Sequence, residues 1–308
     1  MKHQRILVTG GAGFIASHIV DAYLERGCRV FVADDLSRGD RGNVNPSAEL
    51  IERDFADPSV LDLIEREKIE LLNHHAAQID VRISVADPAN DAETNIVASL
   101  RLLERAASAG VKRVVFASSG GAIYGEPQFT PQSEDHPVAP LSPYGCSKLS
   151  LEHYLDYYRT VRGLSAVSLR YANVYGPRQR CDGEAGVVAI FARRMLNREE
   201  IEINGDGNQT RDFVFVEDLV RANVAVSESD LEGSFNVGTG VETTINALFD
   251  EMRRALGYRG DAVHRPAKLG EQVRSVLDGS RLRKAAGLPA PVGLADGLRE
   301  TLEWFRGR

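Results

Sequence analysis

Two side chains that can act on a proton, Tyr144 and Lys148, lie four residues apart in the stretch SPYGCSKLSLEHYLDYY, residues 142–158. In an α-helix four residues advance the chain by about 400°, so the two side chains lie about 40° apart on one face. A surface pair on an amphipathic helix is the alternative to a chemical role. The stretch ASSGGAIYG favours the chemical role, because it places Ser118 and Ser119 at the end of an apolar strand, where open α/β sheets bind ligands.

A tyrosine can act as a base near pH 7 only if its pKa is lowered from about 10 by about 3, which costs about 4 kcal/mol. One ammonium at about 4 Å supplies roughly 4 kcal/mol at an effective dielectric constant of about 20, before its own desolvation is subtracted. Lys148 alone is therefore marginal. An oxidised nicotinamide ring carries a second positive charge, so we expect Tyr144 to become a base only beside a bound oxidised dinucleotide.

The stretch TGGAGFIAS, residues 9–17, has the pattern of a dinucleotide-binding turn. Gly10, Gly13 and Ala16 follow one another at three-residue steps between a predicted strand and a predicted helix, whose N-terminus can bind a pyrophosphate. Asp34 ends the next strand, where a carboxylate can accept hydrogen bonds from the adenosine ribose. A bare glycine turn is the alternative. Asp34 would repel a 2′-phosphate, so the pattern favours NAD over NADP.

The elements that must position these groups alternate along the first 175 residues. Strands are predicted at 5–10, 29–35, 69–77, 111–119 and 164–174, and helices at 13–27, at 95–110 and around Tyr144. Strands that are apolar on both faces and separated by helices indicate a parallel sheet covered on both sides. We therefore predict an α/β fold, a Rossmann-type doubly wound parallel sheet with a smaller C-terminal α/β substrate lobe.

The alternation becomes less regular after residue 175, where short helices and strands follow one another with glycine-rich turns between them. We expect a dinucleotide-binding domain over residues 1–175, with residues 211–240 returning to it. Residues 176–210 and 241–308 are expected to form the substrate lobe.

The composition and net charge of the chain disfavour several classes of protein. The formal net charge is -7 and the isoelectric point about 5.6, which disfavours a nucleic-acid partner. There is no run of 18 apolar residues, so we expect no membrane partner. Three cysteines without a CxxC pair suit a reducing compartment, and the N-terminal MKHQR leads directly into a predicted strand. We expect a soluble, cytoplasmic protein.

A metal site is not expected. His74 and His75 are adjacent but have no second pair of ligands at HxxxH or CxxC spacing. Packing or a place beside the cofactor is the favoured interpretation of both histidines.

Together these residues resemble the extended short-chain dehydrogenase/reductase family and, within it, the nucleotide-sugar epimerases, over essentially the whole chain. The motifs that carry the resemblance are VTGGAGFIAS, Asp34, RDFAD at 53–57, NHHAAQ at 73–78, Asn95, SSGGAIYG, YGCSK, LRYANVYGPRQ, RDFVFVEDL and FNVGTG. Each motif alone is a modest signal, and their order and spacing together are specific. The resemblance implies NAD-dependent epimerisation of a UDP-hexose at C4, through a transient 4-keto sugar, by a homodimer.

The resemblance also implies roles for individual residues. Tyr144 would remove the proton from the sugar 4-hydroxyl, Lys148 would hold the nicotinamide ribose and lower the tyrosine pKa, and Ser119 would hydrogen-bond the reacting oxygen. The implied cofactor contacts are Gly10, Gly13, Phe14, Ile15, Asp34, Asp35, Asp54, Phe55, His75, Ala76, Ala77, Asn95, Tyr144 and Lys148. The implied UDP-sugar contacts are Ser119, Tyr144, Asn173, Val188, Arg211 and Asp278.

Several alternatives stay open at this point. Arg211 can pair bidentately with a diphosphate, or it can form a salt bridge to Asp212 or Glu217. The sugar could be UDP-N-acetylglucosamine, UDP-glucuronate or a dTDP-sugar, and a protein that senses NAD without turnover is a further possibility. Gly120 and Gly121 disfavour dehydration, because neither has an ionisable side chain where dehydratases carry an Asp-Glu pair. A net NADPH-dependent reductase is disfavoured by Asp34.

Overall fold

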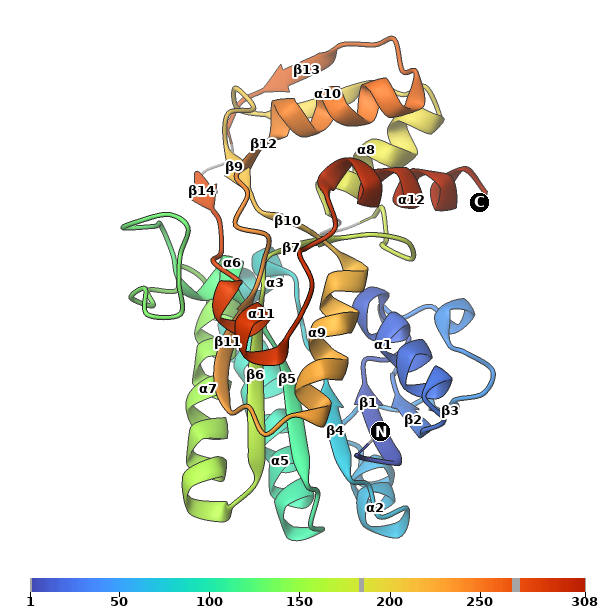
Figure 1. The fold of residues 1–308 in the computed structure, drawn as a ribbon, viewed down its shortest axis with the longest axis vertical. Helices are drawn as coiled ribbons and strands as arrows, with labels where there is room; N and C mark the ends of the chain where they lie inside the picture. The colour runs from blue at the N-terminus through green and yellow to red at the C-terminus, as the bar shows by residue number, and fades with distance from the viewer. Residues whose placement is uncertain (1, 183–185, 268–271, 308) are drawn as a thin grey trace.

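In the computed structural model, which describes residues 2–182, 186–267 and 272–307, a parallel sheet carries a smaller lobe above the carboxyl ends of its strands (Figure 1). The sheet has seven strands in the order β11-β6-β5-β4-β1-β2-β3. They are β1 (Arg5–Thr9), β2 (Arg29–Ala33), β3 (Glu49–Ile51), β4 (Leu71–His74), β5 (Arg113–Ser119), β6 (Ser165–Tyr171) and β11 (Gly233–Val237). All the pairings are parallel, so the predicted Rossmann-type fold is confirmed.

The order of the strands reverses between β1 and β4. From β1 the chain moves outward through β2 to β3, and it then returns to β4 and moves the other way through β5 and β6 to β11. In open α/β sheets the crevice at such a reversal, outside the carboxyl ends of the strands, is where ligands bind. The end of β1, with Gly10, borders this crevice, and the end of β5, with Ser119, lies one strand beyond it.

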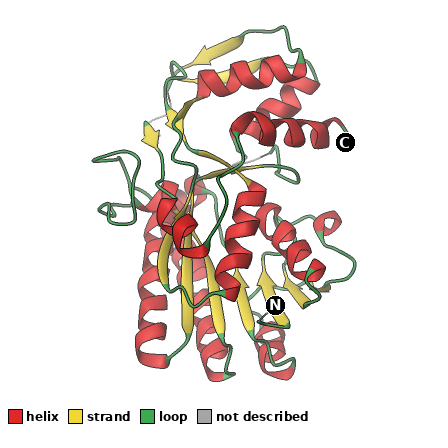
Figure 2. Cartoon of the chain, in the orientation of Figure 1, coloured by secondary structure: helices red, strands yellow, loops and turns green. Residues whose placement is uncertain are grey.

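Helices cover both faces of the sheet (Figures 1 and 2). The main ones are α1 (Phe14–Glu25), α2 (Pro58–Arg66), α5 (Ala98–Ser108), α7 (Pro143–Arg162) and α9 (Val216–Glu228), and shorter ones are η1 (Arg41–Asn43), α3 (Val81–Ala86), α4 (Pro88–Ala92), η2 (Glu93–Val97) and α6 (Gly120–Ile123). Ile6 and Val8 of β1 pack with α1 and α9, whereas Leu7 packs with α2, α5 and α7. Successive strand residues point to opposite faces, so the apolar strands are buried on both sides.

Local signals in the sequence fix where α7 begins and ends. The side chain of Ser142 caps the helix, because its hydroxyl accepts a hydrogen bond of 3.1 Å from the amide of Gly145. Pro143 follows in the first turn, where a missing amide hydrogen costs nothing. Gly163 ends the helix in the left-handed conformation at φ 66°. These caps place Tyr144 in the first turn and Lys148 in the second.

The smaller lobe has its own apolar core, which includes Phe191, Phe249 and Leu302. Its elements are β7 (Asn173–Tyr175), α8 (Val187–Leu196), β8 (Ile201–Asn204), β9 (Thr210–Arg211), β10 (Phe213–Phe215), β12 (Thr243–Thr244), α10 (Ile245–Leu256), β13 (Ala262–Arg265), β14 (Arg274–Ser275) and α12 (Leu294–Arg306). Helix α11 (Ser280–Ala286) packs back against α9 and β11. In the described part of the chain, none of the helices combines the length and apolar character needed to cross a membrane.

Candidate active site

Tyr144, Lys148 and Ser119 meet where α7 passes the carboxyl end of β5. The side chains of Tyr144 and Ser119 share a hydrogen bond. The Lys148 ammonium lies 5.7 Å from the centroid of the Tyr144 ring, and it donates a 2.8 Å hydrogen bond to the carbonyl oxygen of Ala117. The structure therefore brings together a phenol, a hydroxyl and a buried cation.

The protonation of this group is set by burial. Burial raises the pKa of Tyr144 above its ordinary value, the hydrogen bond from Ser119 opposes the rise, and the carboxylate of Asp91 adds to it. Burial lowers the pKa of Lys148 to about 8, against the opposing charges of Asp91 and Glu152. In the chain by itself burial outweighs the ammonium, which agrees with the expectation that Lys148 alone is marginal, and a role of Lys148 in lowering the Tyr144 pKa beside a bound cofactor stays a prediction. A further positive charge at the phenol is needed to ionise it.

The turn between β1 and α1 leaves backbone room for a pyrophosphate. Gly10 has φ +70°, and a Cβ there would lie 2.8 Å from the amide nitrogen of Ala76. A Cβ on Gly13 would meet the carbonyl of Gly10 at 3.0 Å. No side chain caps the N-terminus of α1, where the half-buried Phe14 and Ile15 form the first turn. Its free amide hydrogens suit a phosphate, so the residues present fit a dinucleotide.

Asp34 lies directly after β2, beside the turn between β1 and α1. Its carboxylate accepts hydrogen bonds of 2.9 Å from the amides of Ala12 and Leu36, one on each oxygen. Burial raises the pKa of the Asp34 carboxyl. Each oxygen retains a lone pair that can accept from a ribose hydroxyl. The neighbouring Asp35 is exposed, and its carboxylate accepts from the amide of Ser37 at 2.9 Å.

The two residues predicted to contact adenine lie in different environments. Asp54 is exposed and accepts a 2.8 Å hydrogen bond from the amide of Ala56, which stabilises the turn before α2. Phe55 is buried, with its ring centroid 5.1 Å from that of His74. A contact of either with adenine stays a prediction.

His74 and His75 are neutral parts of hydrogen-bond networks. The two ring nitrogens of His74 pair with the hydroxyls of Thr9 at 2.7 Å and Ser99 at 2.9 Å. His75 pairs through Nε2 with the hydroxyl of Tyr171 at 3.0 Å. Burial lowers the pKa of each histidine to about 3, so neither is charged near neutral pH. Over the described ranges of the chain, three or more potential metal ligands are nowhere grouped.

Asn95 holds the strip of chain beside the dinucleotide turn. Its side-chain amide donates to the carbonyl of Gln78 at 2.9 Å and to Asp91 at 3.0 Å, and its oxygen accepts from the amide of Gln78 at 2.9 Å. These contacts fix the residues that follow the half-buried Ala76 and Ala77. Asn95 lies in the π-helical turn η2, where sequence analysis predicted the start of an ordinary helix.

The predicted substrate residues are distributed around the junction of the two lobes. Asn173 is exposed at the start of β7. Its backbone amide donates a 2.9 Å hydrogen bond to the backbone carbonyl of Asp212, the residue after Arg211. Asp278 precedes α11, and its carboxylate accepts from the amide of Ser280 at 2.9 Å. Val188 is buried in the core of the smaller lobe, in the first turn of α8, and its contact with a nucleotide stays a prediction.

Asp212 is a residue of this junction whose role the sequence analysis missed. The carboxylate is buried, and burial raises its pKa. It accepts hydrogen bonds from the hydroxyl of Thr239 at 2.5 Å and from the amides of Thr239, Gly240 and Leu277 at 3.0 to 3.2 Å. Asp212 therefore joins the segments that carry Arg211 and Asp278. Its position beside Arg211 indicated only a local salt bridge, because the partners are far away in sequence.

Comparison with known proteins agrees with this geometry. Residues 6–238 match the NAD dependent epimerase/dehydratase family. The chain is 44% identical to the UDP-glucose 4-epimerase of Mycolicibacterium smegmatis, over 99% of both chains. It is similar to the crystal structure of UDP-glucose 4-epimerase with UDP-glucose from Thermotoga maritima, with a TM-score of 0.96 and 46% identity over 99% of both chains. A UDP-glucose 4-epimerase of Thermus thermophilus, in complex with NAD, gives a TM-score of 0.93 and 43% identity over 99% of both chains.

Proposed function

Because the chain belongs to the NAD dependent epimerase/dehydratase family, we propose that it interconverts UDP-glucose and UDP-galactose by epimerisation at C4, with NAD as its cofactor. The observation that carries this proposal is the meeting of Tyr144, Ser119 and Lys148 at the carboxyl end of β5, next to the dinucleotide-binding turn. The reaction is an isomerisation, so no cofactor is consumed.

NAD, when bound, supplies a hydride acceptor for the sugar C4 and a positively charged ring near the phenol. Tyr144 takes the proton of the 4-hydroxyl as the carbon is oxidised, and it returns the proton when the 4-keto sugar is reduced on its other face. Ser119 donates to the same sugar oxygen. The ammonium of Lys148, 5.7 Å from the centroid of the Tyr144 ring, stabilises the phenolate form of Tyr144, in which the proton is on the sugar oxygen.

The UDP part of the substrate is proposed to lie at the junction of the two lobes. Arg211 would supply positive charge to the diphosphate. The backbone of Asn173 is hydrogen-bonded to Asp212, the residue after Arg211, so the Asn173 side chain would donate a hydrogen bond to the diphosphate beside Arg211. Asp278 would accept from the uridine ribose. Val188, in the first turn of α8, would border the nucleotide from the core of the smaller lobe.

The first two residues of α6, directly after Ser119, argue against a dehydratase. Gly120 and Gly121 have no ionisable side chain to protonate or deprotonate C5 or C6 of a sugar. A Cβ on Gly120 would collide with the side chain of Leu277, so the position has no room for an acidic residue. The site is therefore suited to return the 4-keto sugar to a hexose and not to eliminate water from it.

A homodimer in the cytoplasm is the proposed form of the enzyme. Tyr154, Tyr157 and Val161 are 41%, 46% and 64% exposed and follow one face of α7, which is an unusual surface for large apolar side chains. Their face of α7, with α5 beside it, is the proposed contact between subunits. The three free cysteines, Cys28, Cys146 and Cys181, suit a reducing compartment. Sedimentation of the wild type against Val161→Glu tests the dimer.

The proposed activity is tested by incubating the purified protein with UDP-galactose, UDP-N-acetylgalactosamine and UDP-galacturonate. Proton NMR then identifies the epimeric products. Conversion of UDP-galactose as the fastest reaction supports the proposal, and faster conversion of one of the other two assigns the enzyme to that sugar. Stoichiometric consumption of added NADH would identify a reductase.

A further inference from the structure

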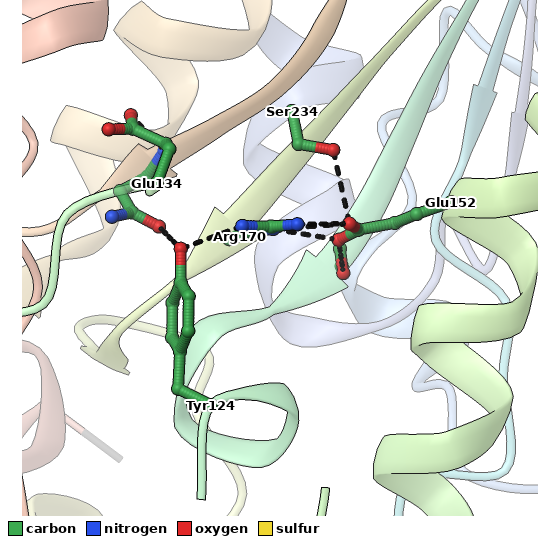
Figure 3. Close-up of polar contacts among 7 residues, drawn as sticks. Tyr124, Glu134, Glu152, Arg170 and Ser234 are labelled. Atoms are coloured by element: carbon green, nitrogen blue, oxygen red, sulfur yellow. Dashed lines mark hydrogen bonds and ion pairs between the residues drawn. The ribbon is translucent and has the colours of Figure 1, made fainter. Parts of the chain in front are cut away.

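A buried ion pair lies beneath the catalytic helix, one turn beyond Lys148. The carboxylate of Glu152 on α7 accepts hydrogen bonds from the guanidinium of Arg170 on β6 at 2.6 Å and 3.1 Å (Figure 3). It also accepts from the hydroxyls of Ser118 at 2.5 Å and Ser234 at 3.1 Å. Glu152 is 4% exposed and Arg170 is 7% exposed. The pair is thus removed from water, with its carboxylate well supplied with donors.

Glu152 and Lys148 hold the same end of β5. Lys148 donates to the carbonyl of Ala117, and Glu152 accepts from the hydroxyl of Ser118, the next residue. The contact of Ser118 with Glu152 fixes the end of β5 beside α7, and the next residue, Ser119, hydrogen-bonds to Tyr144. The spacing of four residues that aligns Tyr144 with Lys148 also aligns Lys148 with Glu152.

The same ion pair reaches the segment that carries a predicted substrate residue. Ser118, Arg170 and Asn236 are opposite one another on β5, β6 and β11. The guanidinium of Arg170 donates to the hydroxyl of Tyr124 at 2.8 Å (Figure 3). This hydroxyl donates to the side-chain oxygen of Asn236 at 2.8 Å. The side-chain amide of Asn236 donates to the carbonyl of Asp278 at 3.3 Å. An unbroken series of hydrogen bonds therefore joins α7 to the loop before α11.

The charge of Glu152 also acts on Lys148. The titratable groups around the ammonium are Tyr144 on the same helix, His74 and His75 on the β4 side, Asp91 on α4 and Glu152 itself. The histidines are neutral, so Asp91 and Glu152 are the anions that oppose the effect of burial. A neutral residue at position 152 would remove one of these anions and leave the buried guanidinium of Arg170 without its counter-ion.

Stability alone is a weak reason for such a pair. The desolvation of two buried charges commonly cancels their attraction, and apolar residues of similar size often stabilise a protein equally well. Here Glu152 accepts a hydrogen bond from Ser118, which precedes Ser119, and its charge acts on Lys148.

We propose that Glu152, held by Arg170, is a positioning residue of the reaction, one that fixes the end of β5 under α7 and keeps Lys148 charged and aligned on Tyr144. The proposal rests on the epimerase function for its kinetic consequences. Its effect on the charge of Lys148 is independent of which sugar the enzyme takes.

The decisive variant is Glu152→Gln, which keeps the shape of the side chain and removes its charge. We expect kcat to fall by about tenfold or more, with the KM for UDP-galactose changed by less than about threefold. The alkaline limb of the kcat profile should move to lower pH. Glu152→Asp, which restores the charge, should recover part of kcat and of the profile.

The titration of Lys148 tests the role of Glu152 without relying on the proposed epimerase activity. The chain has only six lysines, so NMR of the protein labelled with 15N and 13C in lysine can follow the ammonium of Lys148 through its titration. Lys148→Arg assigns the signal. Glu152→Gln should move the midpoint to lower pH by about half a unit or more, as expected for losing one anion near a buried ammonium. This readout applies even if the protein converts none of the UDP-sugars.

Arg113→Gln is the matched control. Arg113 is buried at the other end of β5, where its guanidinium donates to the carbonyl of Val226 at 2.7 Å and the hydroxyl of Ser165 at 2.7 Å. Its loss should lower the Tm without changing kcat or the titration of Lys148. If Glu152→Gln does not fold, Glu152→Gln/Arg170→Gln removes both charges and should shift the Lys148 titration in the same direction, by a smaller amount because a cation is lost together with the anion. An unchanged midpoint and a kcat within twofold of wild type in Glu152→Gln, or in the double variant where Glu152→Gln does not fold, would overturn the proposal.

Discussion

The ammonium of Lys148 lies 5.7 Å from the centroid of the Tyr144 ring, one helical turn further along α7. Burial nevertheless raises the pKa of Tyr144, so the ammonium by itself leaves the phenol protonated. We therefore expect Tyr144 to act as a base only when a further positive charge lies beside it.

Tyr144→Phe removes only the hydroxyl that accepts the sugar proton. We expect kcat to fall by about a thousandfold or more, because general base catalysis is lost while the ring still fills its place. NAD should remain bound, which can be measured by denaturing the purified protein and quantifying the nucleotide released. A variant with the activity of the wild type would show that another group is the base.

Lys148→Ala removes the cation and the hydrogen bond to the carbonyl of Ala117. We expect the variant to lose both turnover and bound NAD, since the lysine is proposed to hold the nicotinamide ribose as well as to stabilise the phenolate. Lys112→Ala, at an exposed lysine just before β5, is the control and should behave as the wild type. Retention of NAD at the wild-type level by Lys148→Ala would contradict the ribose contact.

Gly10→Ala tests the dinucleotide-binding turn. At φ +70° an alanine costs about 1–2 kcal/mol, and its Cβ would also lie 2.8 Å from the amide nitrogen of Ala76. We expect a loss of stability above that range and a weaker affinity for NAD, measured by denaturant unfolding and by calorimetric titration. Gly257→Ala is the control, because its φ is +64° with no atom within 4 Å of a Cβ, and it should show the backbone cost alone. Equal losses in the two variants would argue against a close approach at Gly10.

His74 and His75 predict how stability depends on pH. Burial lowers their pKa from 6.5 to about 3 in the folded protein, so below pH 6.5 the unfolded chain binds protons that the folded chain does not. The contribution of these two histidines to the free energy of unfolding should therefore be constant above about pH 7.5 and fall below pH 6.5, by up to about 1.4 kcal/mol per pH unit for each histidine. Urea unfolding between about pH 5 and 8 measures this slope. His74→Gln should remove the share of one proton from this slope, up to about 1.4 kcal/mol per pH unit. A slope unchanged by the substitution would exclude His74 as a cause of the pH dependence.

The parts of the fold and the site that could be predicted are those set by neighbours in the sequence. The approach of Tyr144 to Lys148 follows from a helical spacing of four, and Gly10, Gly13 and Asp34 follow from one strand-turn-helix-strand unit. The alternation of apolar strands and helices was sufficient to predict the parallel sheet, whose strand β11 comes from the segment expected to return to it.

The parts that could not be predicted depend on strand register and on contacts between distant segments. Glu152 and Arg170 pair only because β6 lies beside β5 under α7, and Asp212 reaches Leu277 across 65 residues. The π-helical turn at Asn95 has no periodic signal that separates it from an α-helix. Val188 was expected to face the nucleotide, but packing in the core of the smaller lobe decides its orientation.

The central claim is that one carbon of the sugar is oxidised and then reduced again within the same site. UDP-galactose carrying deuterium at C4 tests it directly, with catalytic amounts of enzyme and proton and deuterium NMR of the products. The account predicts UDP-glucose with deuterium kept at C4 and no net formation of NADH. Loss of the deuterium to solvent, or its accumulation on free dinucleotide beside a keto sugar, would contradict the account.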